Sequence, residues 1–294
     1  MFRYMDSSVL AWRTDISLLH SAIRIVPMPP SDRDFLSSTM ASCLTASKLD
    51  GVLFGLMVAH RHVAAFVRLK RYALHPRDTH ILLNLISGNS SLRIAEAQTW
   101  TPICLPNFND KGFVYAFISF PWEGSSACLI LLSVKKDHFD PLNEVKKRIV
   151  EKLESNAKFF SSFQCCIENP TAFSISQIGS GNDLLWSFVY KNRNSRQVCN
   201  SGAKMPLISR KERTEIRYLY ERITHVVREE PHMRCLFLRR SHDNVLVWVT
   251  DKFELQCVFS PLVSAVMATT LVDRLLKSLK YHEQRYFILH IPSF

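Results

Sequence analysis

The sequence predicts an α/β protein of the α+β type, in which two tandem domains each combine a mainly antiparallel sheet with flanking helices. The chain has 294 residues, enough for about two domains of 100–200 residues each. Hydrophobic residues make up 47% and charged residues 21%, which is typical of globular proteins with packed cores. The same order of strand and helix patterns also occurs twice along the chain, and this repetition gives the two domains.

The first 50 residues predict short helices and no independent domain. Residues 14–46 have a helical pattern, and a proline-rich run at 26–30 interrupts it because proline breaks the helical hydrogen-bond ladder. Ser31 is the expected N-cap of the second helical piece. Residues 1–50 contain too little apolar sequence to fold alone.

A five-stranded unit is predicted next. Apolar runs at 52–59 and 63–69, joined by a short polar turn, indicate a hairpin. Pro76 is placed at the first turn of a helix that Gly88 ends. The remaining segments are strands at 101–105, 113–120 and 127–134, turns at 109–112 and 122–125, and a long amphipathic helix at 140–156.

A looser copy of this order follows. Residues 184–190 indicate a strand, and 192–205 a polar basic loop. Ser209 and Glu212 have the spacing of a capping box, which predicts a helix that runs to about Arg228. The remaining segments are strands at 235–239, 245–250 and 253–259, a helix from Ser260 to Tyr281, and an extended segment at 286–289.

We therefore predict three segments. Residues 1–50 are the tail of a preceding domain with its linker, residues 51–165 the first complete domain, and residues 172–294 the second. The boundary rests on two clusters of turn residues, at 169–171 and 179–181.

The sequence offers no catalytic, cofactor-binding or metal-ligating residues. Hydrolase, phosphate-loop and zinc-protease motifs are absent, and Gly179 and Gly181 lack the third glycine of a dinucleotide fingerprint. His60 and His62 alternate, but no third ligand with suitable spacing completes a zinc site. The eight cysteines form no C-x-x-C pair, which suits reduced thiols in a cytosolic protein.

The charge favours polyanionic partners. The net charge is +11, with 37 basic and 26 acidic residues. Nucleic acid is disfavoured as the partner, because the 19 phenylalanines lie mostly within strand runs and are not interleaved with the basic residues. No stretch approaches the roughly 20 apolar residues of a membrane-spanning helix, so we expect a cytoplasmic protein with only peripheral membrane contact.

The predicted helix after Ser209 carries the candidate site. From Lys191 to Arg228 there are ten basic residues against three glutamates, a charge of +7. A basic stripe for anionic lipid headgroups is one interpretation, and a solvated face paired with Glu215 and Glu221 is the other. We expect Leu219, Ile223 and Val226 to face the core, away from the stripe. By the step of about 100° per residue, the stripe spans a 60° arc and consists of Arg210, Arg213, Arg217 and Arg228.

Two long stretches resemble a known family. Residues 67–113 contain basic-Tyr-x-Leu-His-Pro and then W-T-P-I-C-L-P-x-F-N, and residues 253–294 begin with F-E-L followed by F-S-P-L. Both are similar to the vacuolar fusion protein Mon-one family. The resemblance covers residues 15–294 and is weakest across 155–205. We expect its motif residues Trp100, Pro102, Phe108, Phe253, Phe259 and Pro261 to determine the fold.

The resemblance implies a fold and a function. The family has three longin domains, each a five-stranded sheet flanked by helices, and this chain would hold the second and third, with most of the first missing. A Ccz-type longin subunit is the implied heterodimer partner. The first domains of both subunits act on a Rab-seven-type small GTPase, and the others build the heterodimer core and face an anionic phosphoinositide membrane surface.

We therefore expect a scaffold subunit of a Mon–Ccz-type guanine-nucleotide exchange complex without covalent catalysis, whose exchange face is missing from this chain. It would act in vesicle trafficking, autophagy, fusion at the late endosome, vacuole or lysosome, and protein targeting to the vacuole. One alternative is a related protein of the Fuzzy or Hermansky–Pudlak type, in trafficking or ciliogenesis with another GTPase. The other is an unrecognised cytosolic enzyme, which a deep pocket lined by convergent polar groups would indicate.

Overall fold

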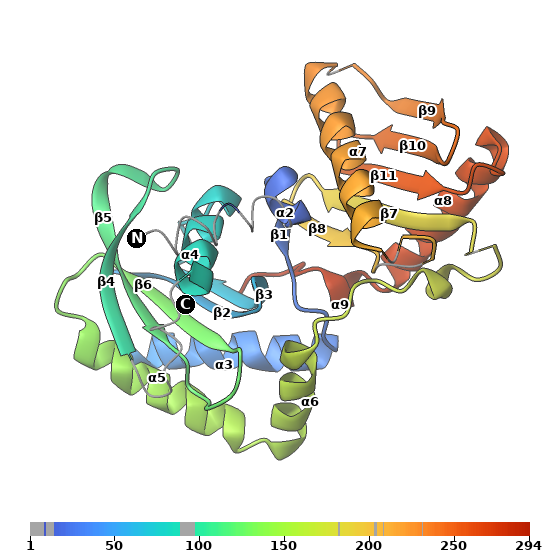
Figure 1. The fold of residues 1–294 in the computed structure, drawn as a ribbon. Coiled ribbons are helices and arrows are strands. Elements are labelled where there is room, and N and C mark those ends of the chain that lie inside the picture. Colours follow the sequence, from blue (N-terminus) through green and yellow to red (C-terminus); the bar gives the residue numbers. More distant parts are fainter. Residues whose placement is uncertain are drawn as a thin grey trace. The chain divides into compact units, whose positions relative to one another are not determined.

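The computed structural model describes residue 9 and residues 15–88, 98–181, 183–202, 205–207, 209–230 and 232–294. The chain divides into two compact units. The N-terminal unit comprises Met1–Thr14, Ile23–Pro170 and Ile288–Phe294, and the C-terminal unit comprises Asp15–Ala22 and Thr171–Phe287. Each unit is an antiparallel sheet with helices on both faces (Figure 1). The predicted fold class is confirmed.

The sheet of the N-terminal unit has five strands in the order β3-β2-β6-β5-β4. All four neighbouring pairs are antiparallel. Every residue of β2 is buried, because helices or loops cover both faces of this strand. The strands are β2 (Val52–Ala59), β3 (His62–Arg68), β4 (Gln98–Leu105), β5 (Asn109–Ser119) and β6 (Cys128–Ser133). The two-residue strand β1 (Ile23–Arg24) precedes them.

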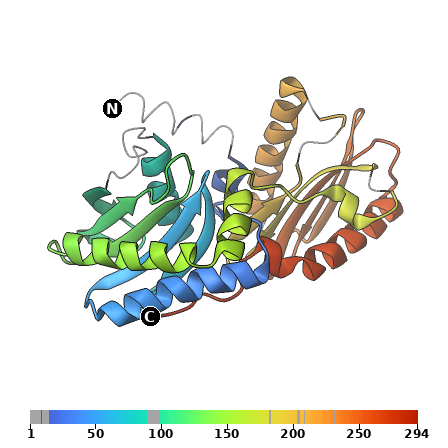
Figure 2. The same ribbon diagram turned by 90° about the horizontal axis from the view of Figure 1, so that it is seen from below.

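Two hydrophobic clusters fill the faces of this sheet. On one face lie α3 (Pro30–Ser47), α5 (Phe139–Glu154) and α6 (Ala157–Glu168). Figure 2 shows α3 and α5 side by side across that face. The other face packs against α4 (Pro76–Gly88) and the C-terminal segment, through residues such as Leu82 and Ile288.

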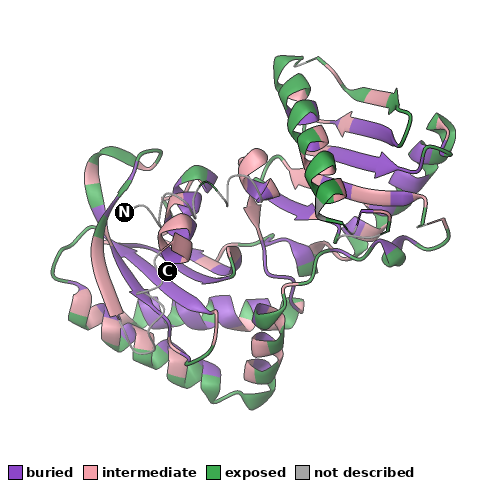
Figure 3. Ribbon diagram, in the orientation of Figure 1, coloured by how far each residue is buried: buried purple, intermediate pink, exposed green. Residues whose placement is uncertain are grey.

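The C-terminal unit contributes five strands in the order β8-β7-β11-β10-β9. Helix α7 (Arg210–Glu229) and the short α2 (Ile16–Leu19) pack on one face, and α8 (Ala265–Tyr281), α9 (Glu283–Tyr286) and the 3-10 turn η2 (Ile175–Ile178) pack on the other. Figure 3 shows that buried residues concentrate on the strands and exposed residues on the outer sides of the helices. The strands are β7 (Leu185–Asn192), β8 (Gln197–Asn200), β9 (Cys235–Arg239), β10 (Asn244–Val249) and β11 (Phe253–Phe259).

Several predicted element boundaries are wrong for identifiable reasons. Helix α8 begins at Ala265 and not at Ser260, since Ser264 caps it by accepting a hydrogen bond from the Met267 amide. The N-cap of α3 is Pro29 and not Ser31, and Pro30 takes the first helical position. Residues 110–112 form a bulge in β5 and not the turn itself, as the register passes from Cys104–Phe113 to Leu105–Asn109.

Both ends of the chain differ from the predicted segments in how they pack. Helix α3, which the sequence assigns to a linker, packs against α5 and β3 within the N-terminal unit. Residues 288–294, predicted as part of the last domain, belong to the N-terminal unit. There the Phe294 amide donates to the Arg68 carbonyl over 3.2 Å.

Candidate functional site

The basic stripe lies on α7, which begins as the sequence predicts. The Glu212 amide donates to Ser209 Oγ, and the Ser209 amide donates to Glu212 Oε2, so the capping box is complete. Arg213 and Arg228 are exposed, and Arg217 is half-buried. Arg210 begins the helix, and its side chain lies outside the described residues.

The stripe is longer and less uniform than a single binding site. Arg213 and Arg217 lie one helical turn apart. Arg228 follows Arg217 by eleven residues, or about 16 Å along the axis at the α-helical rise. One phosphate group therefore cannot contact all three arginines, so the two ends of the stripe cannot belong to the same phosphate site.

The core-facing side of α7 is rotated toward the arginines, which corrects the sequence prediction. Ile223 is buried as expected, but Val226 is 41% exposed. Tyr220 and Thr224 are buried in its place. Thr224 falls at about the same helical angle as Arg213 and Arg217, so the stripe borders the sheet and does not lie opposite it.

This position explains the electrostatics of Arg217. Burial lowers the pKa of its guanidinium, and the negative charges of Glu221 and Asp15 oppose that shift. The guanidinium of Arg217 is thus partly buried within its own unit and interacts there with the charges of Glu221 and Asp15. Arg213, in contrast, has the exposed surface position that the lipid interpretation assumes.

At the other end of the stripe, Arg228 borders a cavity of about 250 Å³. Lys191 of β7 and Arg193, in the turn that follows β7, also line it, together with Glu254 of β11. In the sequence, Lys191 and Arg193 stand out only as members of a basic segment. Arg193 follows β7 by one residue, and the β7–β11 register brings Glu254 opposite Lys191.

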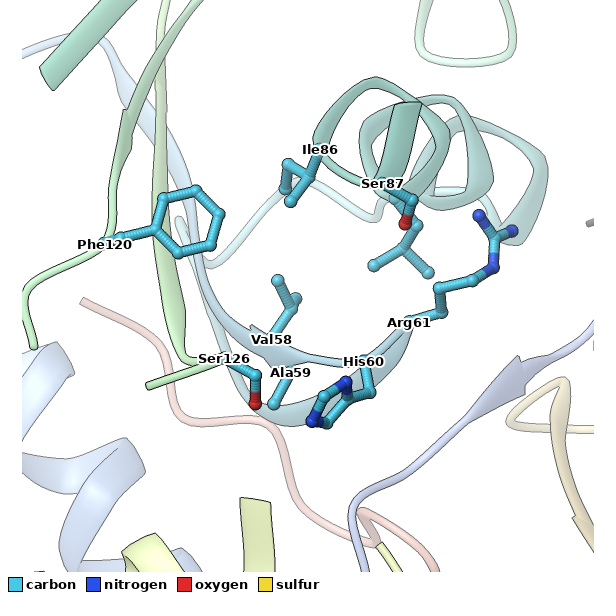
Figure 4. Close-up of a pocket in the computed structure, with 9 residues that line it drawn as sticks. Val58, Ala59, His60, Arg61, Ile86, Ser87, Phe120 and Ser126 are labelled. Carbon is cyan, nitrogen blue, oxygen red and sulfur yellow. The ribbon is translucent and has the colours of Figure 1, made fainter. Parts of the chain in front are cut away.

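A second cavity, of about 240 Å³, lies in the N-terminal unit (Figure 4). Val58, Ile86 and Phe120 form its apolar wall, and His60 and Arg61 stand at the β2–β3 turn. Both turn residues have positive φ angles, 44° and 66°, as a tight two-residue hairpin requires. The hydroxyls of Ser87 and Ser126 also line this cavity.

One hydroxyl–imidazole pair does have the distance of a catalytic dyad. Ser133 Oγ lies 2.8 Å from His138 Nδ1, and burial lowers the pKa of the imidazole, assisted by Lys135. The exposed fractions are 0% for Ser133 and 6% for His138, so a substrate cannot reach the hydroxyl. Ser133 also donates to the Gly51 carbonyl and accepts from the Lys135 amide. This pair fixes the turn after β6.

The described residues form neither a metal-ion cluster nor a disulfide. Within the described ranges, no three His, Cys, Asp or Glu side chains gather as a metal ion requires. The eight cysteines all lie in those ranges and form no disulfide, with Cys165 exposed and Cys166 half-buried on α6. Across the part of the chain that the structure describes, no helix has the length and apolar character needed to cross a membrane.

Comparison with known proteins matches each unit to a domain family. Residues 50–151 match the second longin domain of FUZ, MON1 and HPS1, and residues 184–283 match the third longin domain of the same proteins. These ranges lie within the N-terminal and C-terminal units, respectively. The assignment accounts for a sheet with helices on both faces in each unit.

Whole-chain relatives agree with this assignment. The vacuolar fusion protein MON1 homolog A of Gallus gallus is 32% identical over 288 residues, which cover 98% of this chain and 51% of that protein. Protein SAND of Takifugu rubripes is 33% identical over 94% of this chain and 51% of its own length. The vacuolar fusion protein MON1 of Cryptococcus neoformans is 30% identical over 95% of this chain and 44% of its own length. The chain thus spans about half the length of these relatives.

Proposed function

The chain belongs to the longin-domain family of FUZ, MON1 and HPS1, and from this premise we propose that it is a scaffold subunit of a guanine-nucleotide exchange complex in vacuolar fusion and vesicle trafficking. One observation carries the proposal. Relatives that are named vacuolar fusion proteins align with nearly the whole chain, through both longin units, at 30–32% identity.

The proposed partners are a Ccz-type longin subunit, which would form a heterodimer with this chain, and a Rab-seven-type small GTPase. Exchange is a shift of population in which the factor binds the nucleotide-free GTPase more tightly than the loaded form. It requires no nucleophile or general base. The inaccessible Ser133–His138 pair is compatible with that role.

The proposed location is the cytoplasmic surface of late endosomes, vacuoles or lysosomes. Arg213 and Arg217 on α7 would contact anionic lipid there, with the half-buried Arg217 held close to the sheet. Each basic residue near an anionic membrane contributes about 1 kcal/mol. This contribution is too small for stable binding by two arginines alone, so the heterodimer partner would supply further contacts.

A pull-down followed by a nucleotide-release assay tests the proposal. The full chain is mixed with a Ccz-type subunit, and any complex is added to a Rab-seven-type GTPase loaded with a fluorescent nucleotide. Binding without accelerated release supports a scaffold whose exchange surface lies in the other half of the relatives. Binding with full release contradicts the scaffold role, because it places an exchange surface within the two units. Absence of binding contradicts the proposed partner.

A subunit from a complex of the Hermansky–Pudlak type is the matched control in the same pull-down. The family description includes FUZ and HPS1 as well as MON1, so preferential capture of that subunit would favour the related trafficking role with another GTPase.

A further inference from the structure

The cavity beside Arg228 combines excess positive charge with restricted access. It lies between the C-terminal half of α7 and the ends of β7 and β11. Three cations line it, Lys191, Arg193 and Arg228, with one carboxylate, Glu254. Three positive charges and one negative charge leave a formal excess of +2. The Lys191 and Glu254 side chains are 18% and 13% exposed, so solvent screens this pair less than it would on an open surface. The Arg193 side chain, at 42%, and Arg228 are exposed at the rim.

Glu254 holds two of these cations only loosely. Lys191 Nζ lies 3.3 Å from each of its carboxylate oxygens, and Arg193 Nε lies 3.5 Å from Oε1. Both distances are longer than the 2.7–2.9 Å or so that is typical of strong charge-assisted hydrogen bonds.

The two arginines are anchored by backbone carbonyl groups. Arg193 Nη1 donates to the Thr250 carbonyl over 2.9 Å, and Arg228 Nη2 donates to the Leu19 carbonyl over 2.8 Å. A guanidinium has five N–H donors, so each anchored group keeps further donors. The anchors fix both guanidinium groups at the cavity without neutralising their charge.

Two buried residues that interact with the lining of this cavity have polar atoms without hydrogen-bond partners. His20 is 2% exposed, and neither of its ring nitrogens has a hydrogen-bond partner in the described structure. It lies close enough to Lys191 and Arg228 for both charges to act on it. On the cavity wall, Thr224 Oγ1 accepts from Gln256 Nε2, whose Oε1 is buried and likewise unpartnered. Buried polar groups nearly always have a protein, water or ligand partner, so these atoms indicate a site that holds more than protein.

We propose that this cavity binds a phosphate-type oxyanion, in the form of a phosphate monoester. Two guanidinium groups and an ammonium group suit a tetrahedral dianion, because a guanidinium can donate two parallel hydrogen bonds to its oxygens. Val227 and Val249 supply an apolar wall for the organic part of the ester. Glu254 competes with the ligand for Lys191 and Arg193. A dianion displaces this single carboxylate more readily than a monoanion does, and the site is therefore selective for charge.

The inference does not depend on the exchange-complex role, and it shares only Arg228 with the arginine stripe. A phosphate monoester could come from a soluble metabolite or from a lipid headgroup. Both sources present the same oxyanion to Lys191, Arg193 and Arg228, so the binding chemistry is common to them.

Calorimetry with inorganic phosphate and with glycerol phosphate, at constant ionic strength, tests the site on the full chain. We expect saturable binding that Arg193→Gln and Arg228→Gln each weaken at least fivefold. Glu254→Gln should strengthen binding roughly three- to tenfold, because it removes a competing charge about 4 Å from the ligand. Arg222→Gln is the matched control, since it removes an exposed arginine of the same helix outside the cavity.

Thermal melting without ligand identifies variants that fail to fold. Arg193→Lys keeps the charge and provides a second, milder variant, with intermediate affinity expected. The site is overturned if the folded wild-type chain does not bind either phosphate compound. Equal phosphate affinity in the wild-type and Arg193→Gln chains also overturns it. So does a Glu254→Gln chain whose phosphate affinity is no higher than that of the wild type.

Vesicles separate the two sources of the ligand. One set contains phosphatidylserine alone and the other a phosphorylated phosphatidylinositol at matched total charge. If the ligand is a headgroup, Arg193→Gln abolishes the preference for the second set. If it is a soluble ester, Arg193→Gln weakens glycerol phosphate binding and leaves vesicle binding unchanged. An Arg193→Gln chain that differs from wild type in neither assay contradicts the proposal.

Discussion

Arg228 on α7 donates a hydrogen bond from Nη2 to the carbonyl oxygen of Leu19 at the end of α2, over 2.8 Å, although 209 residues separate the two in sequence. A residue predicted as a surface contact for lipid thus also ties α2 to the helix that covers the sheet. Substitution at Arg228 combines a binding effect with a folding effect. Tests of the lipid stripe are therefore cleaner at Arg213 and Arg217.

Charge reversal of Arg213 and Arg217 should weaken binding to anionic liposomes by about tenfold or more. Each residue near the surface contributes about 1 kcal/mol, and reversal replaces attraction with repulsion. Liposome co-sedimentation at two salt concentrations measures this loss. Arg222→Glu is the matched control for each single reversal, because it makes the same charge change on the opposite side of α7, by the helical step of about 100°. An equal loss in that control would mean that only net charge matters.

Trp100→Ala should destabilise the N-terminal unit by about 2–3 kcal/mol, below the 3–5 kcal/mol or so that is typical of a fully buried aromatic residue. Trp100 is half-buried, stacks on Tyr115 with centroids 5.5 Å apart, and donates from Nε1 to the Lys136 carbonyl. Chemical denaturation measures the change. Pro102→Ala, at an exposed position of the same strand, should cost less than about 0.5 kcal/mol.

Ser209→Ala should destabilise α7 by about 1 kcal/mol, because it removes the hydroxyl that accepts from the Glu212 amide. Denaturation and helical circular dichroism report the effect. Ser209→Asp restores a capping acceptor and should recover most of the loss. A variant with alanine that is as stable as the parent would show that this cap contributes nothing to the unit.

His20 should make the C-terminal unit sensitive to acid. Burial, with a smaller effect of Lys191 and Arg228, lowers its pKa from 6.5 to about 3. Between these values the unfolded chain binds the proton and the folded chain does not, so stability is highest above pH 6.5 and falls as the pH decreases toward 3. The slope approaches about 1.4 kcal/mol per pH unit.

Denaturation of wild-type and His20→Phe chains from pH 7 to pH 4 isolates this contribution, because carboxylates titrate equally in both. As the pH falls, the free energy of unfolding of the wild-type chain should decrease relative to that of the His20→Phe chain. If the two stability curves run parallel over this pH range, folding does not lower the pKa of His20.

Local sequence signals determined much of the fold. The apolar runs on either side of His60 and Arg61 gave β2 and β3, the Ser209–Glu212 spacing gave the start of α7, and Pro76 and Gly88 bounded α4. Each signal is complete within about a dozen residues, and so it can be identified without tertiary contacts.

Other elements depend on partners that are distant in sequence. Helix α6 and strand β8 were missed, because β8 has only four residues and is stabilised as a strand by pairing with β7. Helix α6 buries Phe159 and Phe163 in the core of the N-terminal unit. The placement of residues 288–294 with the N-terminal unit also has no local signal.

The sequence by itself determined the two sheet-and-helix units, the arginine stripe and the family resemblance, because periodicity, caps and motifs act over short distances. Only the tertiary structure decided which side chains surround the arginines of the stripe. The rotation of α7 on its sheet half-buries Arg217, and the β7–β11 register gathers Lys191 and Glu254 beside Arg228. Both the rotation of α7 and the β7–β11 register depend on packing between residues that are distant in sequence. No pattern within one helix encodes that packing.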